Sequence, residues 1–584
     1  MDSIKSFKGY GKVDPAEEQT FRKRTRKRLI VLIVSAVVLV AVIIGAVVGV
    51  VVHKGKSSSD DSIPASSMTP AESLKAVCSV TRYPSSCFSS ISSQAGAFNT
   101  TDPEMFFKLS LRVAINEMSK LSEVPSALME KTDDAQVKAA LTVCGTVFDD
   151  AVDRLNDSLS SLEGENLSSS KIDDMKSWLS ASITDQETCL DALNELNSTH
   201  YGNSSIVEDI TTAMENSTQF ASNSLAIAAK IVSVLSNVKV PIHRRLLGFE
   251  RSDSSGFPRW VSAGDRRLLQ ESKPTPNVTV AADGTGDFTK IKDAVNAVPK
   301  KSKARFVIYI KAGTYKENVI LDKNKWNVMM YGDGQTKTTV SGSLNFIDGT
   351  PTFSTATVAV AGKGFMAKDM TFINTAGPEK HQAVAFRSGS DQSVYYRCTF
   401  DAFQDTLYAH SNRQFYRECD IIGTIDFIFG NAAVVFQNCN IKPRQPLANQ
   451  FNTITAQGKK DPNQNTGISI QKCTFSPLAT LTAPTYLGRP WKNYSTTVIM
   501  QSDIGSFLNP LGWKEWISNV DPPSTIFYAE YQNTGAGSST GQRVKWPGYK
   551  PSLTNVEAGK FTVGTFIQGR VWLPETSVTF EQAL

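Results

Sequence analysis

A six-residue pattern recurs five times in the second half of the chain and constrains the fold more than any other feature. Each copy has Met or Cys at its fourth position and an apolar residue at its sixth. Where no loop intervenes, short strands repeat at about 20 residues, which predicts a parallel β-solenoid whose turns stack on one another. The copies are AKDMTF (367–372), YYRCTF (395–400), YRECDI (416–421), FQNCNI (436–441) and IQKCTF (470–475), and their fourth positions are Met370, Cys398, Cys419, Cys439 and Cys473.

Cysteines occupy the fourth position of the last four copies. Stacked turns bring equivalent side chains of neighbouring turns within the separation that a disulfide spans. We therefore predict the disulfides Cys398–Cys419 and Cys439–Cys473, which are one of the three arrangements that four cysteines allow.

The same period brings four polar side chains together. Gln404 follows Gln382 by about one repeat, and Asp426 follows Asp405 in the same way, so each pair falls on adjacent turns and on one face. Both aspartates are flanked by apolar or aromatic residues, where a carboxylate is costly to bury without a partner. Arg489 is the candidate partner.

Residues 71–238 have a different pattern. Apolar residues recur there at spacings of three and four, as from Val137 to Leu159, which gives a helix one apolar face. Short polar breaks separate such segments, so we predict an antiparallel all-α helical bundle. Nothing in this region resembles a catalytic constellation, and the region is therefore a scaffold or a binder.

The N-terminus predicts insertion into a membrane. Residues 22–28 are almost all basic, and residues 29–52 are apolar and uncharged. At about 1.5 Å per residue, this run exceeds the roughly 30 Å hydrocarbon core of a bilayer. We expect a basic cytoplasmic tail at 1–28, a transmembrane signal anchor at 29–52, a linker at 53–70 and a translocated remainder.

Two further features agree with entry into the secretory pathway. All eight cysteines follow the apolar run, as expected for a chain that forms disulfides. The same part of the chain contains eight N-x-S/T glycosylation acceptors, which are Asn99, Asn156, Asn166, Asn197, Asn203, Asn216, Asn277 and Asn493.

Residues 239–273 have the composition of a processing linker. The tetrapeptide RRLL occurs twice there, with basic pairs at Arg244–Arg245 and Arg266–Arg267, among many Ser, Gly and Pro residues. An exposed segment between domains is where a processing protease finds accessible backbone. We predict cleavage at one of the two RRLL sites by a subtilisin-like protease, which would separate the helical region from the catalytic domain of residues 274–584.

Five segments of the C-terminal domain resemble, in order and rough spacing, those of plant pectin methylesterases. The resemblance covers nearly the whole domain and implies a right-handed parallel β-helix. The helical region is similar to the pectin methylesterase inhibitor family, which forms the pro-region of many such precursors, and this implies the disulfides Cys78–Cys87 and Cys144–Cys189. The five segments are GTYKE (313–317), QAVAFR (382–387), QDTLY (404–408), DFIFG (426–430) and LGRPW (487–491).

The resemblance implies a role for each clustered residue. Asp426 would attack the methyl-ester carbonyl as the nucleophile, and Gln382 and Gln404 would stabilise the developing oxyanion. Asp405 would protonate the departing methanol and then act as the base on water. Arg489 would keep Asp426 ionised and oriented.

The resemblance also implies the partners. Methyl-esterified pectin would be the substrate, with no cofactor and no metal. Tyr408, Phe429 and Trp491 are expected to contact sugar rings beside Arg489 and Gln382, and packing within the solenoid is the alternative for these aromatics. We expect a membrane-anchored precursor, a mature enzyme in the cell wall, a pro-region that restrains activity until it is cut, and separate inhibitor proteins as further partners.

Other classes of function fit less well. Glycosidases also use two carboxylates, but paired glutamines and an arginine suit acyl transfer better. A polysaccharide lyase usually needs calcium, and the sequence has no acidic cluster built for it. An inhibitor or wall-binding protein without activity stays open as an alternative. The formal charge of +5 is slight for 584 residues and no nucleic-acid-binding motif accompanies it, so we expect no nucleic-acid partner.

Overall fold

A computed structural model describes residues 69–163, 168–198, 204–237 and 274–584. The predicted anchor at 29–52 and the linker at 239–273 with both RRLL sites lie outside the described residues. Within the described ranges, no helix is long and apolar enough to cross a membrane. The described helices and strands from Thr69 onward belong to one compact unit.

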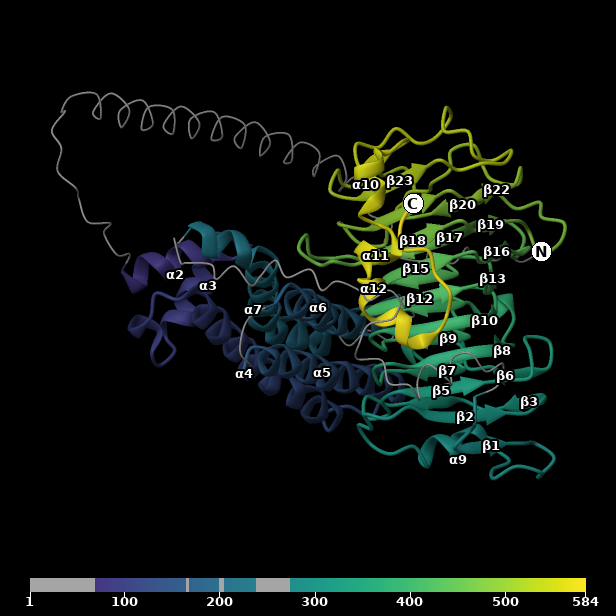
Figure 1. Cartoon of the computed structure of the whole chain (residues 1–584), viewed down its shortest axis with the longest axis horizontal. Coiled ribbons are helices and arrows are strands. Elements are labelled where there is room, and N and C mark those ends of the chain that lie inside the picture. The colour runs from purple at the N-terminus through teal and green to yellow at the C-terminus, as the bar shows by residue number, and fades with distance from the viewer. Residues whose placement is uncertain (1–68, 164–167, 199–203, 238–273) are drawn as a thin grey trace, which may run out of the picture. The chain divides into compact units, whose positions relative to one another are not determined.

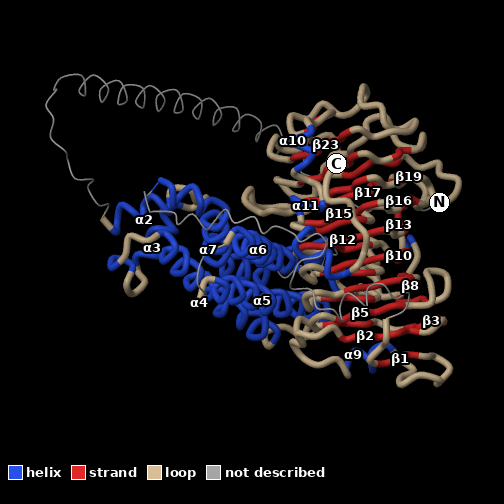
Figure 2. Tube along the Cα trace, viewed as in Figure 1, coloured by secondary structure: helices blue, strands red, loops and turns tan. Residues whose placement is uncertain are grey.

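Long helices come first along the chain and short strands follow (Figure 2). Asp102 and Asp134 begin two of the helices by accepting hydrogen bonds from backbone N–H groups of the first turn. The helices bury their apolar stripes in a shared core, as predicted. Their bounds are α2 (Pro70–Cys78), α3 (Pro84–Ser92), the 3-10 helix η1 (Ala97–Asn99), α4 (Pro103–Met129), α5 (Ala135–Ser161), α6 (Ser169–Ser198) and α7 (Ser204–Asn237).

Both predicted disulfides of the helical region are present. Cys78 and Cys87 join α2 to α3 with their Cα atoms 5.6 Å apart. Cys144 and Cys189 join α5 to α6 across 4.4 Å. Each bond lies in the bundle core and ties together helices that also pack against one another.

The strands form a parallel β-solenoid, as predicted, and Figure 1 shows them following one another in chain order along it. Seven of them make one parallel sheet, here called sheet B: β4 (Val319–Leu321), β7 (Val358–Val360), β9 (Phe386–Ser388), β11 (Leu407–Ala409), β14 (Ile428–Gly430), β17 (Asn452–Gln457) and β20 (Thr485–Gly488). The other 17 make the remaining walls: β1 (Val278–Val280), β2 (Phe306–Ile310), β3 (Gly313–Lys316), β5 (Val328–Tyr331), β6 (Thr338–Gly342), β8 (Met366–Asn374), β10 (Ser393–Asp401), β12 (Arg413–Arg417), β13 (Asp420–Gly423), β15 (Ala433–Gln437), β16 (Asn440–Pro443), β18 (Gly467–Gln471), β19 (Thr474–Phe475), β21 (Thr496–Met500), β22 (Asp503–Ile504), β23 (Phe527–Tyr531) and β24 (Tyr549–Lys550).

Short helices accompany the strands. Those after β24 cover part of the outer wall, where Val563, Ile567 and Trp572 pack against residues such as Phe415. The bounds are α9 (Ile291–Asn296), η3 (Thr352–Ser354), η4 (Pro378–Lys380), α10 (Asn555–Gly559), α11 (Val563–Phe566), α12 (Gly569–Trp572) and η5 (Leu573–Thr576).

The strand register confirms the predicted repeat. Cys398 pairs with Met370 across β10 and β8. Asp420 pairs with Asn440 and Asn440 with Thr474, so the cysteines that precede these three residues stack in one column. Aromatic residues make a parallel ladder, with the ring centroids of Tyr395 and Tyr416 4.3 Å apart. One repeat of the sequence is therefore one turn of the solenoid.

The predicted disulfides of the solenoid are wrong. Cys398, Cys419, Cys439 and Cys473 are free and buried. Stacked strands point equivalent side chains in the same direction, so the Cβ–Sγ bonds of one column run side by side and do not face each other. Each thiol instead lies against a backbone carbonyl, as Cys419 Sγ does at 3.4 Å from the oxygen of Tyr395.

The solenoid has its own core. Its largest apolar cluster runs from Val280 to Tyr549 and contains no described residue of the helical bundle. A segment with a separate core folds as a domain, so residues 274–584 are expected to fold alone.

Five predicted glycosylation acceptors have exposed side chains, and their glycosylation stays a prediction. Asn166 and Asn203 lie outside the described residues. The exposed acceptors are Asn99, Asn156, Asn216, Asn277 and Asn493.

Candidate active site

Two aspartates begin neighbouring turns of sheet B. Leu407 of β11 pairs with Ile428 of β14, and Asp405 and Asp426 precede these partners by the same two residues. Both aspartates have left-handed backbone, with φ of +63° and +51°. Such φ values are uncommon for residues other than glycine and occur at functional sites where the surrounding structure imposes them. The predicted clustering of the two carboxyl groups thus follows from the regular length of the turn.

Asp426 is held by an arginine and a threonine. Arg489, which follows β20, donates from Nη2 to Asp426 Oδ2 at 2.6 Å and from Nε to Oδ1 at 2.9 Å. Thr453 of β17 donates to Asp426 Oδ1 at 2.6 Å and accepts from the Asp426 backbone N–H at 3.0 Å. A two-pronged guanidinium contact fixes the plane of a carboxyl group. The side chain of Asp426, which is only 5% exposed, is therefore held in one orientation.

Asp405 differs from its neighbour. Its side chain is 8% exposed, and burial raises its pKa well above the ordinary value. The nearby carboxyl groups of Asp426 and Glu195 raise this pKa further, while Arg489 opposes them. The raised pKa of Asp405 therefore equips it to hold a proton beside the ion-paired carboxyl group of Asp426.

The two predicted glutamines lie beside the aspartates. Gln382 and Gln404 form an isolated parallel β-bridge, and the backbone N–H of Ala383 donates to the oxygen of Gln404 at 3.2 Å. In the described part of the chain, neither side-chain amide makes a hydrogen bond of its own. Both amides are thus available to donate to a bound group.

An aromatic row extends from this site. Tyr408 and Phe429 pair across β11 and β14, and their stacked rings are 4.2 Å apart. The ring of Trp491 lies 6.2 Å from that of Phe429 and packs on Gly458, where a Cβ would come within 2.9 Å of it. Phe429 and Tyr408 belong to the hydrophobic cluster outside the solenoid core, so packing within the solenoid does not explain them.

Helix α6 covers this row. In the described chain, residues three or four apart along α6 bond to the solenoid, among them Thr188 to His410 at 2.8 Å and Asp191 to Lys492 at 2.5 Å. The backbone N–H of Thr352 donates to Glu195 Oε2 at 3.0 Å. Glu195 is also the helical residue that lies close enough to raise the pKa of Asp405. The helical region thus closes over the proposed catalytic groups.

Three residues of this site escaped the sequence analysis. Thr453 lies on the turn after Asp426, but an inserted loop makes their separation along the chain longer than one regular repeat. Counting repeats in the sequence therefore does not find it. Trp516, whose ring lies 4.2 Å from the guanidinium carbon of Arg489, stands in a loop with no repeat. Glu195 follows Asp191 by four residues, so both lie on one face of a helix. This spacing was the only sequence signal that could have linked Glu195 to the residues of α6 that contact the solenoid.

An ion-paired carboxyl group beside a buried one, with two amides that have no other hydrogen bond and an aromatic row on a β-solenoid, fits a carboxylic ester hydrolase that acts on a carbohydrate polymer. Among the residues described by the structure, no three His, Cys, Asp or Glu side chains are grouped to hold a metal ion.

Comparison with known proteins narrows this class to one family. Residues 277–570 match the family model "Pectinesterase", and residues 72–227 match "Plant invertase/pectin methylesterase inhibitor". The chain therefore belongs to the pectinesterase family and carries an inhibitor-like domain before the enzyme domain.

Relatives of full length support this assignment. The chain is 62% identical over its whole length to all of "Pectinesterase 3" of Phaseolus vulgaris. It is 60% identical, over 99% of both chains, to "Pectinesterase 1" of Arabidopsis thaliana. A solved structure, "Pectin methylesterase from Carrot", is 53% identical, with a TM-score of 0.52, and matches 54% of this chain and 100% of its own.

Proposed function

We propose that the C-terminal domain hydrolyses the methyl esters of homogalacturonan to free carboxylates and methanol. The observation that carries the proposal is the Asp426–Arg489 ion pair, at 2.6 Å, beside the buried and unpaired carboxyl group of Asp405. Methanol release from methylated pectin tests it. New reducing ends would instead indicate a glycosidase, and unsaturated ends a lyase.

In the first step, Asp426 attacks the ester carbonyl carbon. The charge that develops on the carbonyl oxygen is stabilised by the side-chain amides of Gln382 and Gln404, which have no other hydrogen bond in the described structure. Donors that are already in place lower the barrier because they interact more strongly with the transition state than with the ester.

Asp405 then supplies the proton. Its raised pKa keeps it protonated, so it gives its proton to the departing methoxide oxygen as the C–O bond breaks. Methanol leaves, and the acyl group remains on Asp426 as an anhydride. The resulting Asp405 carboxylate takes a proton from water, which hydrolyses the anhydride and restores both side chains. Arg489 keeps Asp426 anionic at the start of each cycle.

Thr453 is expected to position the nucleophile. Because its hydroxyl donates to Asp426 Oδ1 at 2.6 Å, Thr453→Val in residues 274–584 should lower kcat on methylated pectin about tenfold to a hundredfold. Thr453→Ser retains the hydroxyl and is the matched control. Steady-state methanol release checks this, and equal loss in both variants would contradict a role for the hydroxyl.

The aromatic row gives the site its sugar-binding face. Tyr408 and Phe429 stack on each other, and Trp491 lies beside Phe429. We expect pyranose rings to lie along this row once α6 is removed. Trp516 extends the row, since its ring lies 6.4 Å from that of Trp491.

The helical region restrains the enzyme in our proposal. Cover of the aromatic row by α6 supports this, because a polymer could not reach Asp426 with the helix in place. We also propose that cleavage at the RRLL sites by a subtilisin-like protease frees the mature enzyme into the cell wall. The uncut precursor would be held in the membrane by residues 29–52, and separate inhibitor proteins would bind the same face.

The restraint should weaken as pH rises. Burial raises the pKa of Glu195 from 4.5 to about 7. A raised pKa in the closed state stabilises that state fully below pH 4.5, and this contribution is lost as pH rises through about 7. The activity of the full-length chain, relative to residues 274–584, should therefore increase between those values.

Glu195→Gln is the control for this pH effect, because an amide stays neutral throughout. Its activity ratio should be flatter across the same range. A ratio with an unchanged slope in this variant would show that other groups govern the effect.

A further inference from the structure

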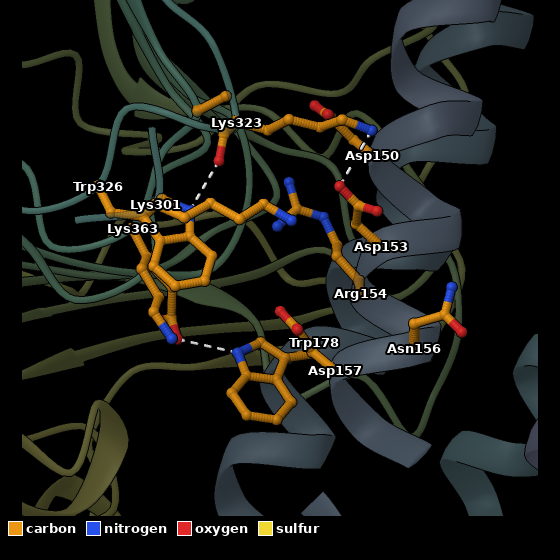
Figure 3. Close-up of a pocket in the computed structure, with 12 residues that line it drawn as sticks. Asp150, Asp153, Arg154, Asn156, Asp157, Trp178, Lys301, Lys323, Trp326 and Lys363 are labelled. Atoms are coloured by element: carbon orange, nitrogen blue, oxygen red, sulfur yellow. Dashed lines mark hydrogen bonds and ion pairs between the residues drawn. The ribbon is translucent and has the colours of Figure 1, made fainter. Parts of the chain in front are cut away.

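A second group of charged and aromatic side chains lies away from the proposed active site. The loops after β4 and β7 carry Lys323, Trp326 and Lys363, and Lys301 lies in the loop after α9. We call these four residues the lysine–tryptophan pocket (Figure 3). Asp405 and Asp426 precede strands of sheet B, whereas this pocket follows strands of the same sheet in earlier turns. The two sites therefore lie at opposite ends of the strands of sheet B.

The pocket is built around the ring of Trp326. Its Nε1 donates to the backbone oxygen of Lys323 at 2.7 Å, which fixes the indole. The ammonium groups of Lys363 and Lys301 lie 4.4 Å and 5.7 Å from the ring centroid. Two cations are thus held against one aromatic ring, where each gains from the ring quadrupole.

The charges of these lysines are only partly compensated. Lys323 Nζ pairs with Asp153 Oδ2 of α5 at 3.0 Å and donates to the backbone oxygen of Asp149 at 3.1 Å. Within the residues that the structure describes, Lys301 and Lys363 have no ion-pair partner. They line a cavity of about 160 Å³ that the side chains of the helical region leave unfilled.

The helix that closes the pocket presents carboxyl groups to it. Asp150, Asp153 and Asp157 are three and four residues apart on α5, so they share one face, and all three line the cavity (Figure 3). At about 1.5 Å rise per residue, these three positions recur every ~4.5 to ~6 Å along the helix axis. The helix therefore places three carboxyl groups opposite these lysines, with the guanidinium group of Arg154 among them.

We propose that the lysine–tryptophan pocket binds demethylated, anionic stretches of galacturonan, and that α5 occupies it before processing. A ring face with adjacent cations suits a uronic acid, because the sugar stacks on Trp326 while its carboxylate pairs with Lys301 or Lys363. This inference rests on the proposed function, which turns neutral ester groups into carboxylates. The pocket would hold the product stretch while the active site acts further along the same polymer.

The test is binding of a fully demethylated galacturonic acid oligomer of about ten units to residues 274–584, measured by calorimetry at low salt. Lys301→Gln, Lys323→Gln and Lys363→Gln together should raise Kd at least about tenfold. The matched control removes three exposed lysines elsewhere, Lys292→Gln, Lys550→Gln and Lys560→Gln, and should change Kd less than about twofold. Trp326→Leu, with all lysines kept, should also weaken binding.

Two outcomes would overturn the proposal. Equal weakening in both triple variants would indicate non-specific attraction between the domain and a polyanion. An unchanged Kd in the pocket variants would show that these lysines serve only to dock α5. Methanol release by the unmodified domain is measured on the same preparation. Failure of the binding proposal, with esterase activity intact, is thereby distinguished from failure of the proposed esterase function.

Discussion

The full-length chain is expected to release methanol from methylated pectin at least about a hundredfold more slowly than residues 274–584 alone. A tethered domain acts at an effective concentration in the millimolar range, so even micromolar affinity would leave about one molecule in a thousand open. The contacts of α6 with His410 and Lys492 supply that affinity next to the aromatic row. Initial rates of the two proteins at equal molarity and pH 5 test this.

Cleavage provides the control for that comparison. A full-length variant with a specific protease site in place of RRLL at 266–269 should gain activity after cutting. Activity should rise faster after cutting with Asp191→Ala, since this change removes the 2.5 Å contact with Lys492 and leaves that lysine only its longer 3.5 Å contact with Glu187. Comparable rates for uncut precursor and isolated domain would contradict restraint by the helical region.

Asp405→Asn in residues 274–584 is expected to lower kcat by about 10²–10⁴-fold. The amide is close in size to the carboxyl group but can neither donate a labile proton to methanol nor accept one from water. Both chemical steps are therefore affected. Methanol production over hours, with thermal unfolding as a check on folding, measures the loss.

Asp401→Asn is the matched control for Asp405. Asp401 lies four residues before Asp405 and forms a 2.7 Å ion pair with Arg444. Arg444 is not one of the proposed catalytic residues. The variant should retain most of the activity. A similar loss in both variants would mean that Asp405 acts through stability alone.

The periodic part of the sequence predicted the periodic part of the structure. A regular repeat fixes which strands stack, because each turn can satisfy its backbone hydrogen bonds only on its neighbours. The pairing of Leu407 with Ile428 follows directly, and so does the clustering of Asp405 with Asp426. Arg489 could be proposed as a partner because a buried carboxylate requires a cation.

The predicted disulfides of the solenoid were wrong because the prediction considered the distance between the cysteines and not the direction of their side chains. Separation along the stack puts Cys398 and Cys419 within range, but bond formation also needs side chains that face each other. The backbone N–H of Cys398 lies 3.4 Å from Cys419 Sγ, so the column is filled by thiols that meet the backbone. Sequence spacing carries no information on that orientation.

Contacts between different kinds of element were beyond the sequence patterns. No period relates Glu195 on a helix to Asp405 on a solenoid turn. Trp516 and Thr453 come from turns whose loops vary in length, which breaks the count from one turn to the next. Their positions depend on packing of whole surfaces, which only the folded chain defines.

The most direct measurement is methanol release from methylated pectin by residues 274–584, beside the Asp426→Asn variant. We predict steady methanol release by the unmodified domain and none above background from the variant, because an amide cannot attack the ester. Thermal unfolding of both proteins confirms that the variant is folded. Equal release from the two would contradict Asp426 as the nucleophile, and release from neither would contradict the esterase function itself.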